Sequence, residues 1–331
     1  MFKSFGGLMS DAAAGKAGDV FGAFVSDPVQ SIAYHIAVMA VTTGIVFKGI
    51  SGGIEKSCKV LMPALFAILL ILIVRSVTLP GAGAGLEFYV KPDFSKLSSQ
   101  ALLAAVGQGF FSLSLGMGCM ITYGSYLGKN DYLPSIARTV VMLDTSVAIL
   151  AGFVIFPAVF AFGIEPGAGP GLTFVTLPAV FAKMPMGSVF SFAFFLLLFI
   201  AALTSAISLL EVVVTYAIDQ MKWNRAKAAI VMGTAIALLG IPSALSVGGH
   251  IPQIAGKDFL DAADFITNNV IMPLGGIFIS VFVGWVWSDG AKAEVTDNGK
   301  LVFPMYTAWL WMCRVVAPVS IAAIFITGLK W

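Results

Sequence analysis

The stretch AAVGQGFFSLSLGMGCMITYGSYL, residues 104–127, is apolar at both ends and interrupted in its middle by hydroxyls and glycines. Ser112 and Ser114 lie two positions apart, so they would point to different faces of a helix. Gly116 and Gly118 weaken a helix at the same place. An unwound turn here would free carbonyls for a cation and amide N–H groups for a carboxylate. Packing of small residues between membrane helices explains the same pattern, and the sequence leaves both interpretations open.

The composition is that of an integral membrane protein. Of the 331 residues, 59% are hydrophobic and 11% are charged, whereas a soluble domain carries about 25% charged residues. The formal net charge of +2 gives no electrostatic footprint for nucleic acid, so we expect no nucleic-acid partner. The cysteines lie in or beside apolar runs, which predicts small packing residues rather than disulfides or a metal site; they are Cys58, Cys119 and Cys313.

Apolar runs long enough to cross a bilayer, about 20 residues each, recur along the chain. We expect about eight transmembrane helices, at residues 29–47, 59–79, 100–127, 137–162, 187–217, 226–246, 262–287 and 301–329. The links between them are polar or rich in Gly and Pro. The link 163–186 is long and half apolar, so we expect it to fold into short helices that do not cross. The link 289–300 is expected to be a polar turn.

The Lys and Arg residues indicate the orientation of the chain. If the basic link 49–59 is cytoplasmic, ten of the 19 Lys and Arg residues lie on that side, Arg225 and Lys292 among them, and eight lie on the other side. Arg314 is inside the last span and needs a partner or must extend to the interface. Eight spans make residues 1–28 an extracellular-side loop. A polar start on the outer face predicts that further helices precede Met1.

A second apolar run, residues 188–218, carries a polar stripe. Its members Thr204, Ser208, Glu211 and Thr215 follow one another at helical spacing on one face. Such a stripe must face protein or water, and hydroxyl and carbonyl oxygens are hard ligands that suit an alkali cation. Hydroxyls bonded to their own helix, with a Glu near the interface, are the alternative.

Asp144 lies inside the apolar run 137–162. A carboxylate within a membrane segment indicates a functional site, and its charge could offset that of a bound cation. The alternative is an aspartate that extends to the interface. The chain shows no HExxH motif and no nucleophile with a base in reach, so the sequence predicts no enzyme.

The chain resembles the neurotransmitter:sodium symporter family in its bacterial, LeuT-like branch. Besides residues 104–127, the resemblance is carried by GIEKSCKVLMPALF (53–66), KPDFSKL (91–97), GLTFVTLPAVFAKMP (171–185) and FFLLLFIAALTSAISLLEVVVTYAID (194–219). It implies an all-α polytopic protein with the LeuT-type inverted-repeat fold, truncated before its fourth helix. Residues 29–79 would be the last two helices of the first repeat, 100–287 the second repeat and 301–329 the final helix.

The resemblance implies sodium-driven symport of an amino acid across the cell inner (plasma) membrane, with two sodium sites in a complete protein. Ser112 and Asp144 match the first site. A carboxylate at 144, with Ala148 near it where relatives carry a chloride-site serine, would replace chloride. The second site matches the Ala201 carbonyl, Thr204 and Ser205.

Further matches concern the substrate and the gates. The substrate residues are Phe111, Ser114, Met117, Ser208 and Leu209, and their small or apolar character implies a neutral or hydrophobic amino acid. Asp264 matches an outer-gate carboxylate, and Asp219 and Tyr126 match inner-gate residues. The family's GNxWRFPY-like motif is absent, so we expect this chain alone to be inactive. A non-transporting membrane fragment or interaction subunit is the alternative.

Overall fold

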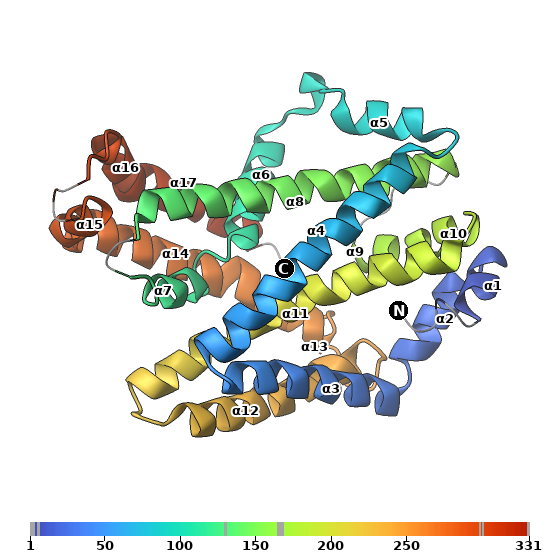
Figure 1. Cartoon of the computed structure of the whole chain (residues 1–331), viewed down its shortest axis with the longest axis horizontal. Coiled ribbons are helices and arrows are strands. Elements are labelled where there is room, and N and C mark those ends of the chain that lie inside the picture. The colour runs from blue at the N-terminus through green and yellow to red at the C-terminus, as the bar shows by residue number, and fades with distance from the viewer. Residues whose placement is uncertain are drawn as a thin grey trace. The chain divides into compact units, whose positions relative to one another are not determined.

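The computed structural model describes residues 4, 7–128, 131–163, 169–297, 299 and 301–329, and this part of the chain is helical without strands (Figure 1). Four cations counted for the orientation, Lys3, Lys129, Lys300 and Lys330, lie outside the described residues. So do residues 164–168 of the predicted link 163–186.

Within the described residues, seven helical segments are long and apolar enough to cross a membrane. They are α3 (Pro28–Phe47), Ile50–Val77 (η2 and α4), α8 (Leu133–Ala161), α11 (Gly187–Asp219), α12 (Arg225–Ser246), Phe259–Val286 (α13, η5, α14 and η6) and Tyr306–Gly328 (α16, η7 and α17). The predicted span 100–127 is instead two helices, α6 (Ser99–Ser112) and α7 (Cys119–Gly124). The eight expected spans are therefore seven long segments and one broken one.

Short helices occupy the links. Residues 1–28, expected to be a loop, contain α1 (Leu8–Ala13) and α2 (Ala17–Val25). The link before α6 contains α5 (Ala82–Val90) and η3 (Phe94–Lys96). The link 163–186 contains α9 (Gly169–Gly171), η4 (Leu172–Thr176) and α10 (Leu177–Ala182), as predicted. The predicted turn 289–300 is wrong in its first half, where α15 (Ser288–Val295) is helical.

Capping residues fix where two of the spans begin. The Asp27 carboxylate accepts hydrogen bonds from the backbone N–H groups of Val29 and Gln30, and the bond from Gln30 lowers the pKa of Asp27 below its ordinary value. Asn224 caps α12 by accepting a bond from the Lys227 N–H. Such caps satisfy N–H groups that the first helical turn leaves without partners.

The chain divides into two compact units. The first comprises Met1–Pro92 and Val147–Leu260, and the second Asp93–Ser146 and Asp261–Trp331. In the first unit, α3 and α12 run side by side (Figure 1), and α11 packs against α3, α4 and α12. In the second unit, α17 packs against α14 and α6.

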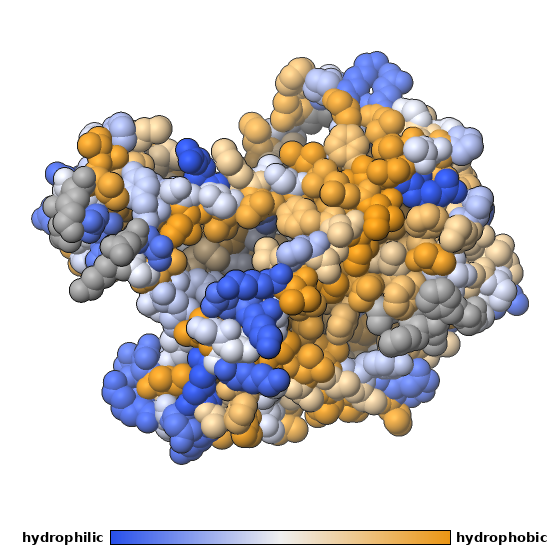
Figure 2. All heavy atoms as spheres, in the orientation of Figure 1, coloured by the Kyte–Doolittle hydropathy of each residue, from blue (hydrophilic) through white to orange (hydrophobic). Residues whose placement is uncertain are grey.

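The surface is consistent with a lipid environment. On the face that Figure 2 shows, hydrophobic residues cover broad areas, and hydrophilic ones gather in patches. Large apolar side chains are exposed along the spans, for example Leu239 at 74% and Phe278 at 69%. A contiguous apolar surface of this kind marks contact with a membrane or a partner.

Candidate functional site

The break between α6 and α7 is the structural centre of the predicted site. After α6 ends at Ser112, the backbone enters the left-handed region at Ser114 (φ 53°), Gly116 (φ 80°) and Gly118 (φ 83°). A side chain at Gly116 would drive its Cβ into the Met272 carbonyl oxygen, so only glycine fits there. The structure thus contains the unwound turn, and close packing against α14 accompanies it.

Ser112 and Asp144, 32 positions apart in sequence, meet within the second unit. The Ser112 hydroxyl lies 2.7 Å from Asp144 Oδ1 and 2.8 Å from Oδ2, and it donates its hydrogen to this carboxylate. Both residues are half-buried. Asp144 is 11 residues after the start of α8, about 16 Å along the helix at 1.5 Å per residue. A carboxylate and a hydroxyl therefore face each other well inside a membrane-spanning helix.

On α11 the hydroxyls bond to their own helix. Thr204 Oγ1 donates to the Ala201 carbonyl at 2.9 Å, and Ser205 Oγ donates to the same oxygen at 3.2 Å. Ser208 Oγ donates to the Thr204 carbonyl at 3.0 Å. This is the back-bonded alternative that the sequence left open. Because a donating hydroxyl keeps its lone pairs, these oxygens can still act as cation ligands.

Glu211, on the same polar stripe, has a different role from its neighbours. Its side chain is fully buried, and its oxygens pair with Arg225 Nη1 at 3.0 Å and Nη2 at 2.5 Å. Arg225 Nε also donates to the Val46 carbonyl at 3.0 Å. The sequence analysis counted Arg225 only for the orientation of the chain and did not anticipate that it would pair with Glu211. The signal in the sequence was a lone Glu in an apolar run followed by an Arg at the start of the next.

The remaining predicted substrate residues differ in how far they are exposed. Phe111 and Leu209 are about half exposed, and Ser114 and Met117 are half-buried at the α6–α7 break.

The three gate residues are also varied. Asp264 is exposed and accepts a hydrogen bond from Asn268 Nδ2 at 2.8 Å. Asp219 is the exposed last residue of α11. Tyr126 stacks edge-on with Tyr123 at 6.4 Å between ring centroids.

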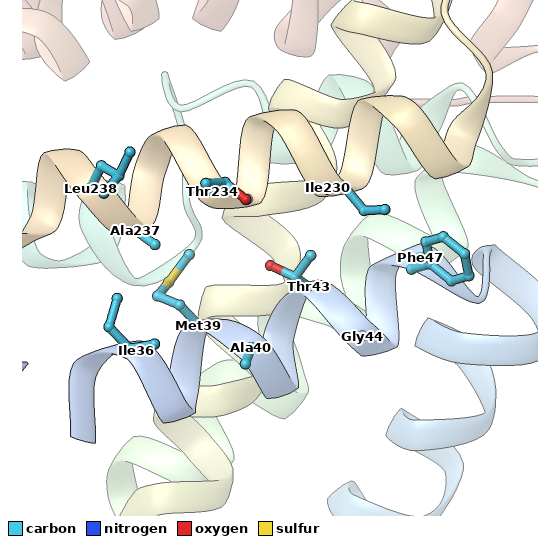
Figure 3. A pocket seen from close by; sticks show the side chains of 11 residues that line it. Ile36, Met39, Ala40, Thr43, Gly44, Phe47, Ile230, Thr234, Ala237 and Leu238 are labelled. Atoms are coloured by element: carbon cyan, nitrogen blue, oxygen red, sulfur yellow. The ribbon is translucent and has the colours of Figure 1, made fainter. Parts of the chain in front are cut away.

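A groove of about 420 Å³ lies between α3 and α12 (Figure 3). Its walls are mostly apolar, with Met39 and Phe47 on α3 and Leu238 on α12. The Thr43 and Thr234 side chains extend into the space between the two helices. None of the predicted ion, substrate or gate residues lines this groove, so the groove does not belong to the candidate site.

The long apolar segments and the broken helix define a multi-pass, all-helical membrane protein over the described residues. A crystal structure of MhsT in complex with L-phenylalanine superimposes with a TM-score of 0.83 at 42% identity, covering 97% of this chain and 75% of that one. The family model described as the sodium:neurotransmitter symporter family matches residues 26–331. The chain belongs to this family, whose members are transporters and not enzymes.

Curated relatives carry matching descriptions. An uncharacterized sodium-dependent transporter, YhdH of Bacillus subtilis, is 37% identical over 326 residues, 98% of this chain and 72% of the relative. One from Haemophilus influenzae is 42% identical over 92% of this chain and 66% of the relative. A third, MJ1319 of Methanocaldococcus jannaschii, is 33% identical over 87% of this chain and 59% of its own length. This chain thus spans about three fifths to three quarters of the relatives that it matches.

Proposed function

We propose that this chain supplies ion- and substrate-binding residues of a sodium-coupled amino-acid symporter. The observation that carries the proposal is the contact between Ser112 and Asp144 beside the unwound turn. A dehydrated alkali cation in a membrane needs several oxygen ligands and a compensating charge. This pair offers both, and broken helices with free carbonyls are where transporters hold such ions.

Sodium is cargo in this mechanism, and two groups of residues would bind it. Ser112 and Asp144 form the first group, where the fixed charge of Asp144 takes the place of chloride. The Ala201 carbonyl, Thr204 and Ser205 form the second, which is supported by their position within one turn of α11. Both groups offer oxygen atoms as ligands, which suit sodium, and neither needs the nitrogen or sulfur ligands that transition metals prefer.

The substrate is proposed to be a neutral or hydrophobic amino acid. Two observations support this class: the small or apolar candidate contacts, and the L-phenylalanine in the MhsT complex. The contacts are Phe111, Ser114, Met117, Ser208 and Leu209. Backbone N–H groups at the α6–α7 break would bind the substrate carboxylate, while the apolar side chains would contact its side chain.

Gating and driving force complete the proposal. Asp264 would act at the outer gate, and Asp219 and Tyr126 at the inner one. The sodium gradient across the inner (plasma) membrane drives uptake, and the membrane potential adds about 2.3 kcal/mol per charge per 100 mV.

The test is sodium-dependent binding and uptake of labelled L-phenylalanine by this chain in proteoliposomes. An inward sodium gradient is compared with an equal potassium gradient, and binding is measured separately in detergent. Binding that needs sodium supports the proposal, and uptake in addition would contradict the expectation that this chain alone is inactive. Absence of both binding and uptake would contradict the proposal for this chain and favour the non-transporting fragment or interaction subunit.

A further inference from the structure

Arg314 lies inside the predicted last span, 301–329, and nothing in the transport proposal uses it. It lies eight residues after the start of the Tyr306–Gly328 segment, about 12 Å along the helix. Its Nε donates to the Gly284 carbonyl at 2.6 Å, and Gly284 is two residues from the end of Phe259–Val286. Since long helical side chains lean toward the helix N-terminus, the guanidinium reaches toward the membrane surface at which α15 lies.

Two π-helical turns hold this arginine in place. They are η6 (Phe282–Val286) and η7 (Met312–Val316), and such turns release backbone carbonyls from the helical pattern. Trp285 Nε1 donates to the Arg314 carbonyl at 3.2 Å. In the neighbouring turn, Ser280 Oγ donates to the Cys313 carbonyl at 2.8 Å. Each of the two segments therefore donates hydrogen bonds to the backbone of the other. These bonds hold Arg314 next to Gly284 and Trp285.

The close approach depends on Gly284. A Cβ at this position would lie 2.9 Å from Arg314 Cγ and 3.1 Å from its backbone nitrogen. The guanidinium carbon lies 5.3 Å from the centroid of the Trp285 ring, within the range of a cation–π contact. The Trp285 side chain is itself 61% exposed, so the stacked pair lies at the surface of its unit.

Among the residues that the structure describes, no carboxylate pairs with the Arg314 guanidinium. Its Nε uses one of the five N–H donors of a guanidinium. Over the part of the chain that the structure describes, the remaining donors have no hydrogen-bond acceptor, and no carboxylate lies within 4.0 Å. An arginine in a membrane segment without a counter-charge is costly. It therefore calls for an anion from outside the chain.

The surroundings favour an anion that brings hydrocarbon with it. Exposed apolar side chains flank the pair on the same two π-helical turns: Phe282, Val286, Met312 and Val315. Tryptophan, like tyrosine, is enriched in membrane proteins at the level of the lipid headgroups. A planar guanidinium binds phosphate oxygens with two parallel hydrogen bonds.

We propose that Arg314, stacked on Trp285, binds the phosphate of an anionic phospholipid in the leaflet at the α15 side. The free N–H groups donate to two phosphate oxygens, and the acyl chains lie against the apolar side chains of η6 and η7. The neighbouring α15 carries Asp289 and Glu294 as well as Lys292. Attraction therefore rests on the direct guanidinium contact rather than on a broad positive field.

The experiment is native mass spectrometry of the intact chain released from bilayers that contain phosphatidylcholine and phosphatidylglycerol. We expect the parent protein to retain phosphatidylglycerol selectively, and Arg314→Gln to lower that preference about tenfold, the effect of one charge-assisted hydrogen bond. Arg75→Gln is the matched control, since Arg75 also lies over an aromatic ring, that of Phe190 at 5.5 Å. The control should keep the preference.

Two further measurements test the proposal: a second variant, and competition with inorganic phosphate. Trp285→Leu removes the stacking partner while leaving the charge of Arg314, so it should lower the preference for phosphatidylglycerol by less than tenfold. It provides the test if Arg314→Gln fails to fold. Excess inorganic phosphate should not displace the lipid, because free phosphate lacks acyl chains. Displacement by phosphate, equal losses in Arg75→Gln, or an unchanged preference in both Trp285→Leu and a folded Arg314→Gln would each overturn the proposal. The readout is independent of transport.

Discussion

At the scale of single residues, Asp144 is central to the proposed ion site. Its carboxylate accepts the Ser112 hydroxyl through both oxygens, and it does so deep within α8. The same hydroxyl could accept a cation with its lone pairs while it donates to Asp144. One fixed negative charge at this place therefore both orients a ligand and offsets a cation.

Replacing Asp144 by Asn should weaken sodium binding. Opposite charges 4 Å apart interact by about 4 kcal/mol at an effective dielectric of 20; Asn keeps one oxygen but loses the charge, so we expect the half-saturating sodium concentration to rise at least about tenfold. The measurement is sodium-dependent phenylalanine binding, in chloride and in gluconate. Rescue by chloride would identify the lost charge as the cause, and identical curves for both proteins would remove Asp144 from the ion site.

The double substitution Thr204→Ala with Ser205→Ala should also raise the half-saturating sodium concentration, because it removes two oxygen ligands. Among the described residues, both hydroxyls bond to the Ala201 carbonyl of their own helix, so their loss should cost little folding stability. Ser146→Ala is the control, since the Ser146 hydroxyl makes the same kind of bond, to the Met142 carbonyl at 2.6 Å. A sodium dependence that is equal in the double variant and the control contradicts a role in ion binding.

At the scale of elements, one ion pair connects three helices. Arg225 at the start of α12 reaches Glu211 on α11 and the Val46 carbonyl near the end of α3. The Arg225 side chain is 24% exposed and that of Glu211 is fully buried. The pair therefore fixes how these helices pack, and each partner depends on the other.

Removing Arg225 alone should be strongly destabilising. Arg225→Gln leaves the Glu211 charge buried without its partner, which typically costs about 3–5 kcal/mol. Unfolding in detergent, followed by intrinsic fluorescence, gives the comparison with the parent. The double change Glu211→Leu with Arg225→Leu should recover most of the loss, because a well-packed apolar pair of similar size is often neutral. A single variant as stable as the parent would show that water or lipid already solvates this pair.

The unwound turn gives a second prediction at this scale. Gly116→Ala should destabilise the fold, because the added Cβ would collide with the Met272 carbonyl oxygen and φ is +80°. Gly109→Ala, inside α6 with no atom near the added Cβ, should be neutral or stabilising by up to about 1 kcal/mol. The difference between the two melting temperatures is the measurement. Equal stability would mean that the α6–α7 break does not need glycine.

At the scale of the whole molecule, the chain is a multi-pass membrane protein of a transporter family. Its orientation can be tested with single cysteines placed in a cysteine-free background. Following the distribution of Lys and Arg, Ser95→Cys should react with a membrane-impermeant maleimide on intact cells. Glu294→Cys on α15 should react only after permeabilisation. Both positions are exposed, so the reverse pattern would invert the orientation.

Sequence alone determined the membrane class and the bounds of most spans within a few residues, and it offered a break within residues 104–127 as one of two interpretations, which the structure then decided. These features are local: hydropathy and length decide what enters a bilayer, and glycine and serine decide where a helix unwinds. The same local signals led to the short helices of the link 163–186. They missed α15, whose polar residues resemble those of a turn.

Only the tertiary structure decided which side chains meet. Ser112 with Asp144, Glu211 with Arg225, and Arg314 with Gly284 come from different helices. A periodic apolar pattern gives the face of a helix, but the rotation and axial shift of that helix against its neighbours follow from packing. A charged residue in an apolar segment therefore predicts that a partner exists, but only the packing of the helices shows which residue that partner is.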